Sequence, residues 1–277
     1  MKLYTINTGF FKLDGGAMFG VVPKTIWEHI NPPDEKNLCT WAMRCLLVDT
    51  GSRRILIDTG LGNKQSPKFF SYYGPHGTDT LLTSLAQYGY KPEDISDVIL
   101  THLHFDHCGG AVRQAENGQL QPLFPNAVYW SNVQHWEAAL NPNAREKASF
   151  LKENFVPLAE NGLIRHVKDG DFIAEGVHVE FVYGHTQAMM LPHIAYRGTT
   201  LVYLADLIPS VGHIKLPYVM GYDTQPLITL QEKARFLQKA AREKHLLFFE
   251  HDPTTACVEV LFSERGDVVA GNTQSID

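Results

Sequence analysis

The feature that most constrains this chain is the decapeptide THLHFDHCGG at 101–110, which follows a predicted β-strand at 97–100. Four side chains that commonly bind metals lie within six of its residues: His102, His104, Asp106 and His107. Residues two apart in an extended chain point the same way, so the first two histidines can bind one ion. If the chain then turns, the aspartate and the last histidine face a neighbouring point and can bind a second. Imidazole and carboxylate together suit zinc and similar divalent metals.

The residues that close the decapeptide are small. Gly109 and Gly110 would let the backbone pack tightly against the site. Cys108 is expected to be a small buried thiol and not a ligand. The alternative is an exposed loop that happens to be rich in histidine. Four ligand-type residues directly behind an apolar strand argue against that alternative.

Apolar patterning predicts one α/β domain over residues 1–277, built from two similar halves. Strands are predicted at 3–6, 43–49, 54–58, 97–100, 178–183, 193–196, 201–205 and 246–249, and helices at 79–88, 131–139, 144–159 and 226–244. Between the first two strands lies a Gly- and Pro-rich segment at about 15–37. A loop of this length in a compact domain usually covers a binding site.

Charge and composition exclude several classes of protein. The 24 basic and 30 acidic residues give a net charge of −6 with no dense basic run, so no nucleic-acid partner is expected. No stretch approaches the roughly 20 apolar residues that span a membrane, and the N-terminus lacks an apolar signal-peptide run. The four cysteines are scattered without a CxxC pair. We therefore expect a cytoplasmic protein with neither a nucleic-acid nor a membrane partner.

Four further motifs follow strand-like runs along the chain: Asp58 in LIDTG, His185 in YGHTQ, Asp206 in VYLAD and His251 in FFEHD. Together with HxHxDH they resemble the metallo-β-lactamase superfamily, and the resemblance covers about residues 3–263. It implies a four-layer αββα sandwich.

The resemblance also implies a ligand set for two divalent ions per chain. His102, His104 and His185 would bind the first ion. Asp106, His107 and His251 would bind the second, and Asp206 would bridge both. Asp58 would accept hydrogen bonds that hold the signature loop in shape. Zinc is the expected metal, with manganese and iron as alternatives.

The remaining histidines lack this spacing. Seven are expected to be surface or structural residues: His29, His76, His135, His166, His178, His213 and His245. The eighth, His193, begins a predicted strand soon after His185 and is the one most worth following.

Two divalent ions about 3.5–4 Å apart can share a water and lower its pKa towards neutrality. The expected reaction is therefore hydrolysis, in which a metal-bridged hydroxide attacks a carbonyl. Asp106 would orient the nucleophile and carry a proton to the leaving group. The GxSxG motif, which carries the nucleophilic serine of many hydrolases, is absent from the sequence.

Two alternatives belong to other classes. Iron would suit an oxidoreductase, but similar relatives carry a flavodoxin-like extension, and only about 26 residues follow His251. A binding protein stabilised by metal is the non-enzyme alternative. Structural sites use four protein ligands per ion, whereas this set shares seven ligands between two ions.

Within the superfamily, the chain resembles the N-acyl homoserine lactonase and methyl parathion hydrolase branch, through FFKLDGGAMFGVVPKTIWEHINPPDEKN and RCLLVDTG. This implies a lactonase, with a phosphotriesterase or another ester hydrolase as alternatives. The short tail argues against a glyoxalase II, and a bridging Asp206, where many β-lactamases have cysteine, argues against β-lactams. Four loop residues are predicted to cover the substrate: Phe19, Val21, Val22 and Trp27. The alternatives are that they pack the loop onto the domain or form a homodimer contact.

Two departures from this branch stand out. The chain reads GHTQAMM where many relatives have GHTxGH. Pro209 occupies the position of a tyrosine that contacts the substrate carbonyl in the better-known lactonases. Tyr218 and Tyr222 are the alternatives for supplying that phenol.

Overall fold

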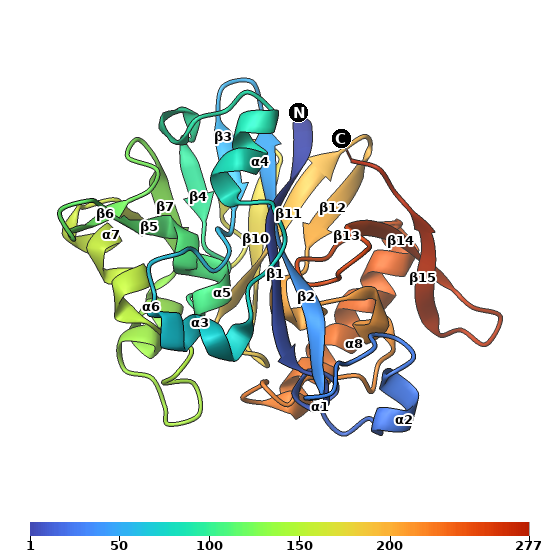
Figure 1. The fold of residues 1–277 in the computed structure, drawn as a ribbon. Coiled ribbons are helices and arrows are strands. Elements are labelled where there is room, and N and C mark those ends of the chain that lie inside the picture. Colours follow the sequence, from blue (N-terminus) through green and yellow to red (C-terminus); the bar gives the residue numbers. More distant parts are fainter. Residues whose placement is uncertain (277) are drawn as a thin grey trace.

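Two β-sheets pack face to face in the computed structural model, which describes residues 1–276 (Figure 1). The first sheet has the order β1-β2-β3-β4-β7-β8, formed by Lys2–Asp14, Leu38–Asp49, Arg54–Ile57, Asp97–Ile99, Val128–Ser131 and Ile164–His166. The second has the order β15-β14-β13-β12-β11-β10-β9, formed by Val268–Thr273, Cys257–Phe262, Leu246–Phe248, Thr199–Tyr203, Met189–Tyr196, Val177–Val182 and Phe172–Ala174. A small ribbon joins β5 (Val112–Gln114) to β6 (Leu120–Pro122).

The central strands are apolar on both faces, because each face is covered. In β2, Leu46 and Val48 pack between the two sheets, whereas Cys45 and Leu47 pack against the helices on the outer side. Alternate residues of a strand point to opposite faces, so this near-continuous apolar run fills two separate cores.

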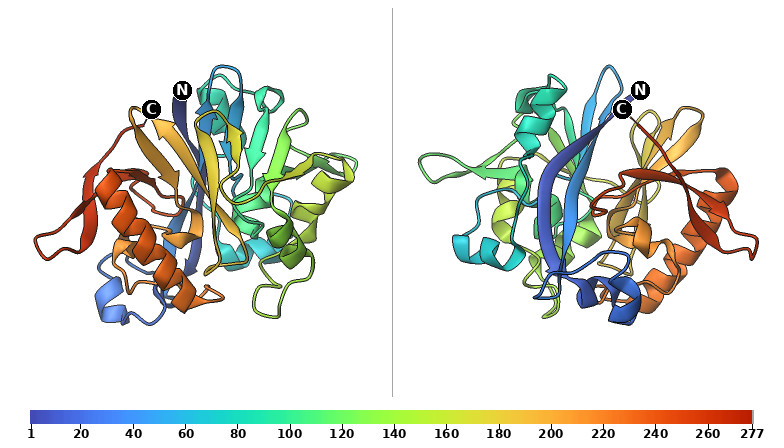
Figure 2. Two further views of the ribbon diagram at one scale, coloured as in Figure 1. Left: turned by 180° about the vertical axis from the view of Figure 1, so that it is seen from behind. Right: turned by 45° about the vertical axis from the view of Figure 1, so that its right-hand side comes forward.

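Helices cover the outer face of each sheet and complete the predicted four-layer sandwich (Figures 1 and 2). The first sheet is covered by α4 (Leu81–Gln87), α6 (Val133–Leu140) and α7 (Val156–Glu160). The second is covered by α8 (Pro226–Glu243), whose Phe236 and Leu237 are buried in its core. The other α-helices among residues 1–276 are α1 (Gly15–Phe19), α2 (Lys24–Trp27), α3 (Pro67–Tyr73) and α5 (Phe105–Cys108).

One predicted helix is wrong. Instead of a helix over 144–159, the chain forms turns followed by the short α7. The Asn143 side chain accepts hydrogen bonds from the backbone N–H groups of Arg145 and Glu146, which favours a turn. Pro157 then lies in the first turn of α7, where its missing N–H is tolerated. The turn directs the Glu146 side chain inward.

The N-terminal segment at 15–37 differs from a plain loop because it contains α1 and α2. The Asp14 side chain caps α1 by accepting from the backbone N–H of Ala17. Outside this segment, the other predicted helices are present with slightly shifted ends, and every predicted strand is present. Three of these strands are longer than predicted, namely β1, β2 and β11. The strands β5 to β9, β14 and β15 were not predicted.

Five strands end where the chemistry-bearing residues begin. Asp58 follows β3, His102 follows β4, and His185 follows β10. Asp206 follows β12 and His251 follows β13, which run parallel to each other. Both sheets therefore deliver polar side chains from strand ends to one common region. Among residues 1–276, no helix has the length and apolar character needed to cross a bilayer.

Candidate metal centre

The signature loop brings its first two histidines together as their spacing predicts. His102 Nε2 lies 3.1 Å from His104 Nδ1, and His185 Nε2 lies 3.3 Å from the same His104 atom. Asp206 Oδ2 completes the group, at 3.1 Å from His185 Nε2 and 3.6 Å from His102 Nε2. Metal–ligand bonds of about 2.0–2.1 Å in a tetrahedron give ligand–ligand distances of about 3.3 Å. This group therefore has the dimensions of one metal site.

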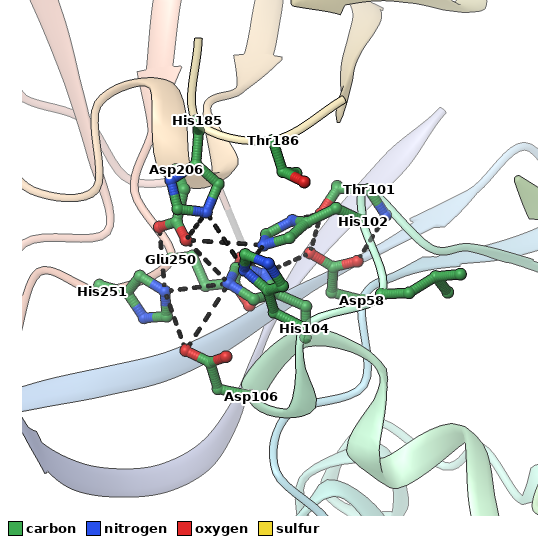
Figure 3. Close-up of polar contacts among 12 residues, drawn as sticks. Asp58, Thr101, His102, His104, Asp106, His185, Thr186, Asp206, Glu250 and His251 are labelled. Carbon is green, nitrogen blue, oxygen red and sulfur yellow. Dashed lines mark hydrogen bonds and ion pairs between the residues drawn. The ribbon is translucent and has the colours of Figure 1, made fainter. Parts of the chain in front are cut away.

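A second group lies beside the first (Figure 3). His107 Nε2 and His251 Nε2 are 3.2 Å apart, and Asp106 Oδ2 lies 3.7 and 3.8 Å from them. Asp206 also reaches this group, because its Oδ2 is 3.3 Å from His107 Nε2 and its Oδ1 is 3.3 Å from His251 Nε2. The structure thus brings together all seven predicted ligands, with Asp206 between the two groups.

The protonation pattern suits a bound cation. On four of the five histidines the outer ring nitrogen lies within hydrogen-bond distance of an oxygen: His102 Nδ1 at Thr101 Oγ1 (3.1 Å), His107 Nδ1 at Asp58 Oδ2 (3.1 Å), His185 Nδ1 at Asp223 Oδ1 (2.8 Å) and His251 Nδ1 at the Ala42 carbonyl (2.8 Å). Glu250 Oε2 also lies 2.9 Å from His107 Nδ1. His104 Nε2 lies 3.7 Å from Glu146 Oε1. Outer nitrogens that donate leave lone pairs on the inner ones. Converging lone pairs repel one another unless a cation lies between them, so these residues fit two divalent ions.

Electrostatics also favour the charged form of the bridging carboxylate. Burial opposes ionisation of Asp206, but the nearby His185, His107 and His251 outweigh it and lower its pKa well below the ordinary value. Within residues 1–276, Asp206 Oδ1 has no hydrogen-bond partner. A buried carboxylate oxygen without a partner is costly, and a metal ion would satisfy it.

Asp58 holds the signature loop, as the resemblance implied. Its Oδ1 accepts from the backbone N–H of Thr101 at 2.8 Å, and its Oδ2 accepts from Thr101 Oγ1 at 2.6 Å. The same Oδ2 lies 3.1 Å from His107 Nδ1. Asp58 has a left-handed φ of 57°, a conformation that costs energy in a residue other than glycine.

The two glycines of the signature are required by close backbone packing. A Cβ on Gly109 would lie 2.1 Å from the Leu61 carbonyl oxygen. A Cβ on Gly110 would lie 2.2 Å from the Thr59 carbonyl oxygen. Neighbouring Cys108 is buried and free, as expected.

Three carboxylates around the centre were missed by sequence reasoning. Asp223 bonds His185, and Glu250 lies beside His107, as described above. Glu146 lies against His104 and accepts from Thr186 Oγ1 at 2.5 Å. Burial opposes the charge of Glu146, but the nearby His104 imidazole and the hydrogen bond from Thr186 lower its pKa to about 2. Glu250 was detectable, because it directly precedes a predicted ligand in FFEHD. Asp223 and Glu146 follow no strand and had no such signal.

His135 is a further residue whose role the sequence did not show. It lies on α6, is fully buried, and its Nε2 accepts from the backbone N–H of Leu103 at 2.8 Å. Its Nδ1 donates to the Gln187 carbonyl at 2.7 Å. Burial lowers its pKa to about 4, so it is neutral at pH 7. His135 therefore connects the loop of His102 and His104 to the loop of His185.

The other non-ligand histidines lie apart from the two groups. His193 is buried and pairs with Glu180 at 3.1 Å, and its ring stacks on His178. His245 pairs with Glu243 at 3.0 Å. His213 Nε2 lies 2.9 Å from the Met18 carbonyl oxygen, which ties α1 to the loop after Asp206. His29, His76 and His166 are exposed.

A cavity of about 330 Å³ opens onto both groups. Its lining includes apolar and aromatic residues (Leu13, Met18, Tyr73, Phe105, Met220 and Tyr222) and polar ones (Arg145, Glu146 and Ser149). Five of the predicted metal ligands also line it: His104, Asp106, His185, Asp206 and His251. Tyr222 lines this cavity, whereas Tyr218 packs edge-on against Phe19.

The four residues predicted to cover the substrate do not line this cavity. Phe19 and Trp27 are buried and stack on each other, with ring centroids 5.5 Å apart. Val22 packs against the same apolar cluster, and Val21 is 94% exposed. Their contact with substrate stays a prediction, and the cavity wall offers other residues for that role.

Comparison with known proteins agrees with this geometry. Residues 44–251 match the family described as the Metallo-beta-lactamase superfamily. The chain is 28% identical over 265 residues to an N-acyl homoserine lactonase from Bacillus cereus, covering 91% of this chain and 93% of that protein.

Solved structures share the fold over nearly the whole chain. A probable metal-dependent hydrolase from Staphylococcus aureus superposes with a TM-score of 0.88 at 27% identity, covering 99% of this chain and 98% of the other. AidC, a dizinc quorum-quenching lactonase solved in complex with a product, superposes with a TM-score of 0.81 at 21% identity, covering 99% and 95%.

We expect His135→Ala to weaken metal binding about 10- to 100-fold, because the two ligand loops lose their connection. The measurement is zinc affinity by competition with a chromophoric chelator. His29→Ala, which changes an exposed histidine, should leave the affinity unchanged. Equal affinities in the two variants would show that His135 does not position the ligands.

Proposed function

Because the chain belongs to the metallo-beta-lactamase superfamily and is a metallo-hydrolase, we propose that it opens N-acyl homoserine lactones or closely related esters with two metal ions. The observation that carries the proposal is the pair of ligand groups that share Asp206 at a cavity whose lining includes apolar residues. The relatives named above as lactonases support the substrate class. If lactones are the substrates, the enzyme would quench quorum sensing.

We assign the first ion to His102, His104 and His185, the second to Asp106, His107 and His251, and Asp206 to both. Zinc is the metal we propose, since histidine with carboxylate suits it, and manganese and iron remain the alternatives. Two such ions, when bound, would polarise the substrate carbonyl and generate a nucleophile from water near neutral pH.

The protein's own residues would position the substrate and transfer a proton from the attacking water to the leaving group. Asp106 lines the cavity and directs Oδ2 towards His107 and His251, so it can accept a proton from the attacking water. It can return that proton to the alkoxide that leaves when the lactone ring opens. The carboxylate therefore acts as both base and acid within one turnover.

The shape of the cavity supports an amphipathic substrate. Leu13, Met18 and Met220 would contact an acyl chain. Tyr222 is the phenol that we propose in place of the tyrosine replaced by Pro209. A phenol with an ordinary pKa of about 10 is protonated near neutral pH, so the Tyr222 hydroxyl can donate a hydrogen bond to the substrate carbonyl.

We retain the expectation of a homodimer formed through the 15–37 segment. Val21, Ile26 and Ile30 expose apolar surface there, at 94%, 49% and 40%. Such clustered apolar exposure supports a protein contact.

The function is tested with metal-free protein reconstituted separately with zinc, manganese and iron. We expect hydrolysis of acyl homoserine lactones to exceed that of aryl esters and phosphotriesters, and a chelator to abolish it. Product acid can be followed by pH-stat titration. Preferential hydrolysis of phosphotriesters would favour that alternative, and two bound ions with no turnover on any substrate would favour a binding protein.

Asp106→Asn should lower kcat at least 100-fold while changing KM little, because the amide cannot carry the proton. Asp267→Asn, at an exposed turn, is the matched control and should behave as wild type. Metal content must be measured alongside, since Asp106 is also an assigned ligand. An unchanged kcat at full metal occupancy would exclude the proton-carrying role.

Tyr222→Phe should lower kcat about tenfold or more, since it removes a hydroxyl donor and leaves the ring in the cavity wall. Tyr218→Phe is the matched control, because Tyr218 packs against Phe19 outside the cavity. Steady-state rates on one lactone decide the matter. If the two variants are equally active, the phenol comes from another residue, such as Tyr73.

A further inference from the structure

One segment at the site has little secondary structure of its own. Residues 215–223 lie between the short turn Val211–Ile214 and α8. They contribute Met220, Gly221 and Tyr222 to the cavity, and Asp223 to His185. What fixes the path of this segment therefore also fixes the orientation of an assigned ligand.

Lys233 on α8 holds the start of the segment. It is fully buried, and its Nζ donates to the carbonyls of Lys215 at 2.7 Å, Tyr218 at 2.8 Å and Leu216 at 3.3 Å. These three bonds use all three donors of the ammonium. Among residues 1–276, no carboxylate lies within ion-pair distance of it. Burial removes water from the Lys233 ammonium, which disfavours its charged form and lowers its pKa to about 7.

The preceding residue, Glu232, binds the backbone of the loop that carries His185. Its two carboxylate oxygens accept from the backbone N–H groups of Tyr183 at 2.8 Å and Gly184 at 3.0 Å. These residues lie immediately before His185. Adjacent acidic and basic side chains of one helix thus bind the backbones of two loops, and the two loops meet at the bond between His185 and Asp223.

Further hydrogen bonds close the arrangement. The backbone N–H of Thr224 donates to the His185 carbonyl at 3.0 Å. Across the cavity, the Arg145 guanidinium donates to the carbonyls of Gly221 and Asp223. The segment is therefore held at its start by Lys233, and near its end by Arg145 and the His185 loop.

We propose that Glu232 and Lys233 are positioning residues for the metal ligand His185, with Lys233 acting through the 215–223 segment and Asp223. The inference rests on the proposed function in one respect, the assignment of His185 as a ligand of the first ion. Neither residue touches the cavity, so neither is a catalytic residue. Their effect is to aim the imidazole before the metal arrives.

The test is zinc affinity at each of the two sites, measured by chelator competition on metal-free protein. Lys233→Met keeps the volume and removes the three donors, and should weaken one site at least tenfold while the other stays within threefold. Lys239→Met, at an exposed position of the same helix, is the matched control and should change neither. Unchanged affinities, or equal loss at both sites together with a lower melting temperature, would overturn the proposal.

A double-mutant cycle tests whether Lys233 acts on His185 through Asp223. Asp223→Asn alone should weaken zinc binding at the same site, and adding Lys233→Met should then weaken it less than threefold further. If the losses of zinc affinity in the two single variants multiply in the double variant, Lys233 does not act through Asp223. If Lys233→Met does not fold, Glu232→Gln decides instead, since it should weaken the same single site.

The two proposals fail in different ways. The titration needs no substrate, so a protein that binds two ions but opens no lactone would refute the proposed function and leave this inference standing. An active lactonase whose Lys233→Met and Glu232→Gln variants bind zinc like wild type would refute only this inference.

Discussion

The mutual repulsion of converging lone pairs is the constraint on which the rest of this structure depends. Five imidazole nitrogens and two carboxylates point at two adjacent positions, and Asp206 belongs to both. Such a cluster is stable only if positive charge occupies it and if each ring is held from behind. Oxygens of Thr101, Ala42, Asp223 and Asp58 meet the second requirement, because they hydrogen-bond to the outer ring nitrogens. The strained φ of Asp58 and the tight packing of Gly110 are local costs of that arrangement.

Spacing alone predicted only the local part of the two ligand groups: His102 and His104 are two apart in extended chain and can face one ion. The assignment of His185, Asp206 and His251 came from the resemblance to the superfamily, although Asp206 and His251 do each follow an apolar strand. The near-continuous apolar run of β2 likewise made a buried strand recognisable. The features that could be predicted from residue spacing are those that depend on neighbouring residues in the sequence.

The remainder depends on paths that loops take in three dimensions. Asp223 and Lys233 contact the site through the irregular segment at 215–223, whose course no periodicity describes. The Asn143 turn replaced a helix that apolar spacing favoured, and it carried Glu146 to His104. Phe19 and Trp27 have the composition of a substrate cover, but composition cannot tell which way a side chain faces. Their mutual stacking and burial were decided by α1, α2 and His213.

The strand order has a consequence for how such a protein is made. Asp58, His102 and His107 come from the first sheet, whereas His185, Asp206 and His251 come from the second. Neither half alone can supply the full set of assigned ligands, and His251, the last of them, is synthesised after all the others. Metal binding at the assigned ligands would therefore require the two sheets to have docked. Contacts this distant in sequence form slowly. Metal binding would therefore indicate that the tertiary structure is complete, whereas secondary structure can form before the two sheets dock.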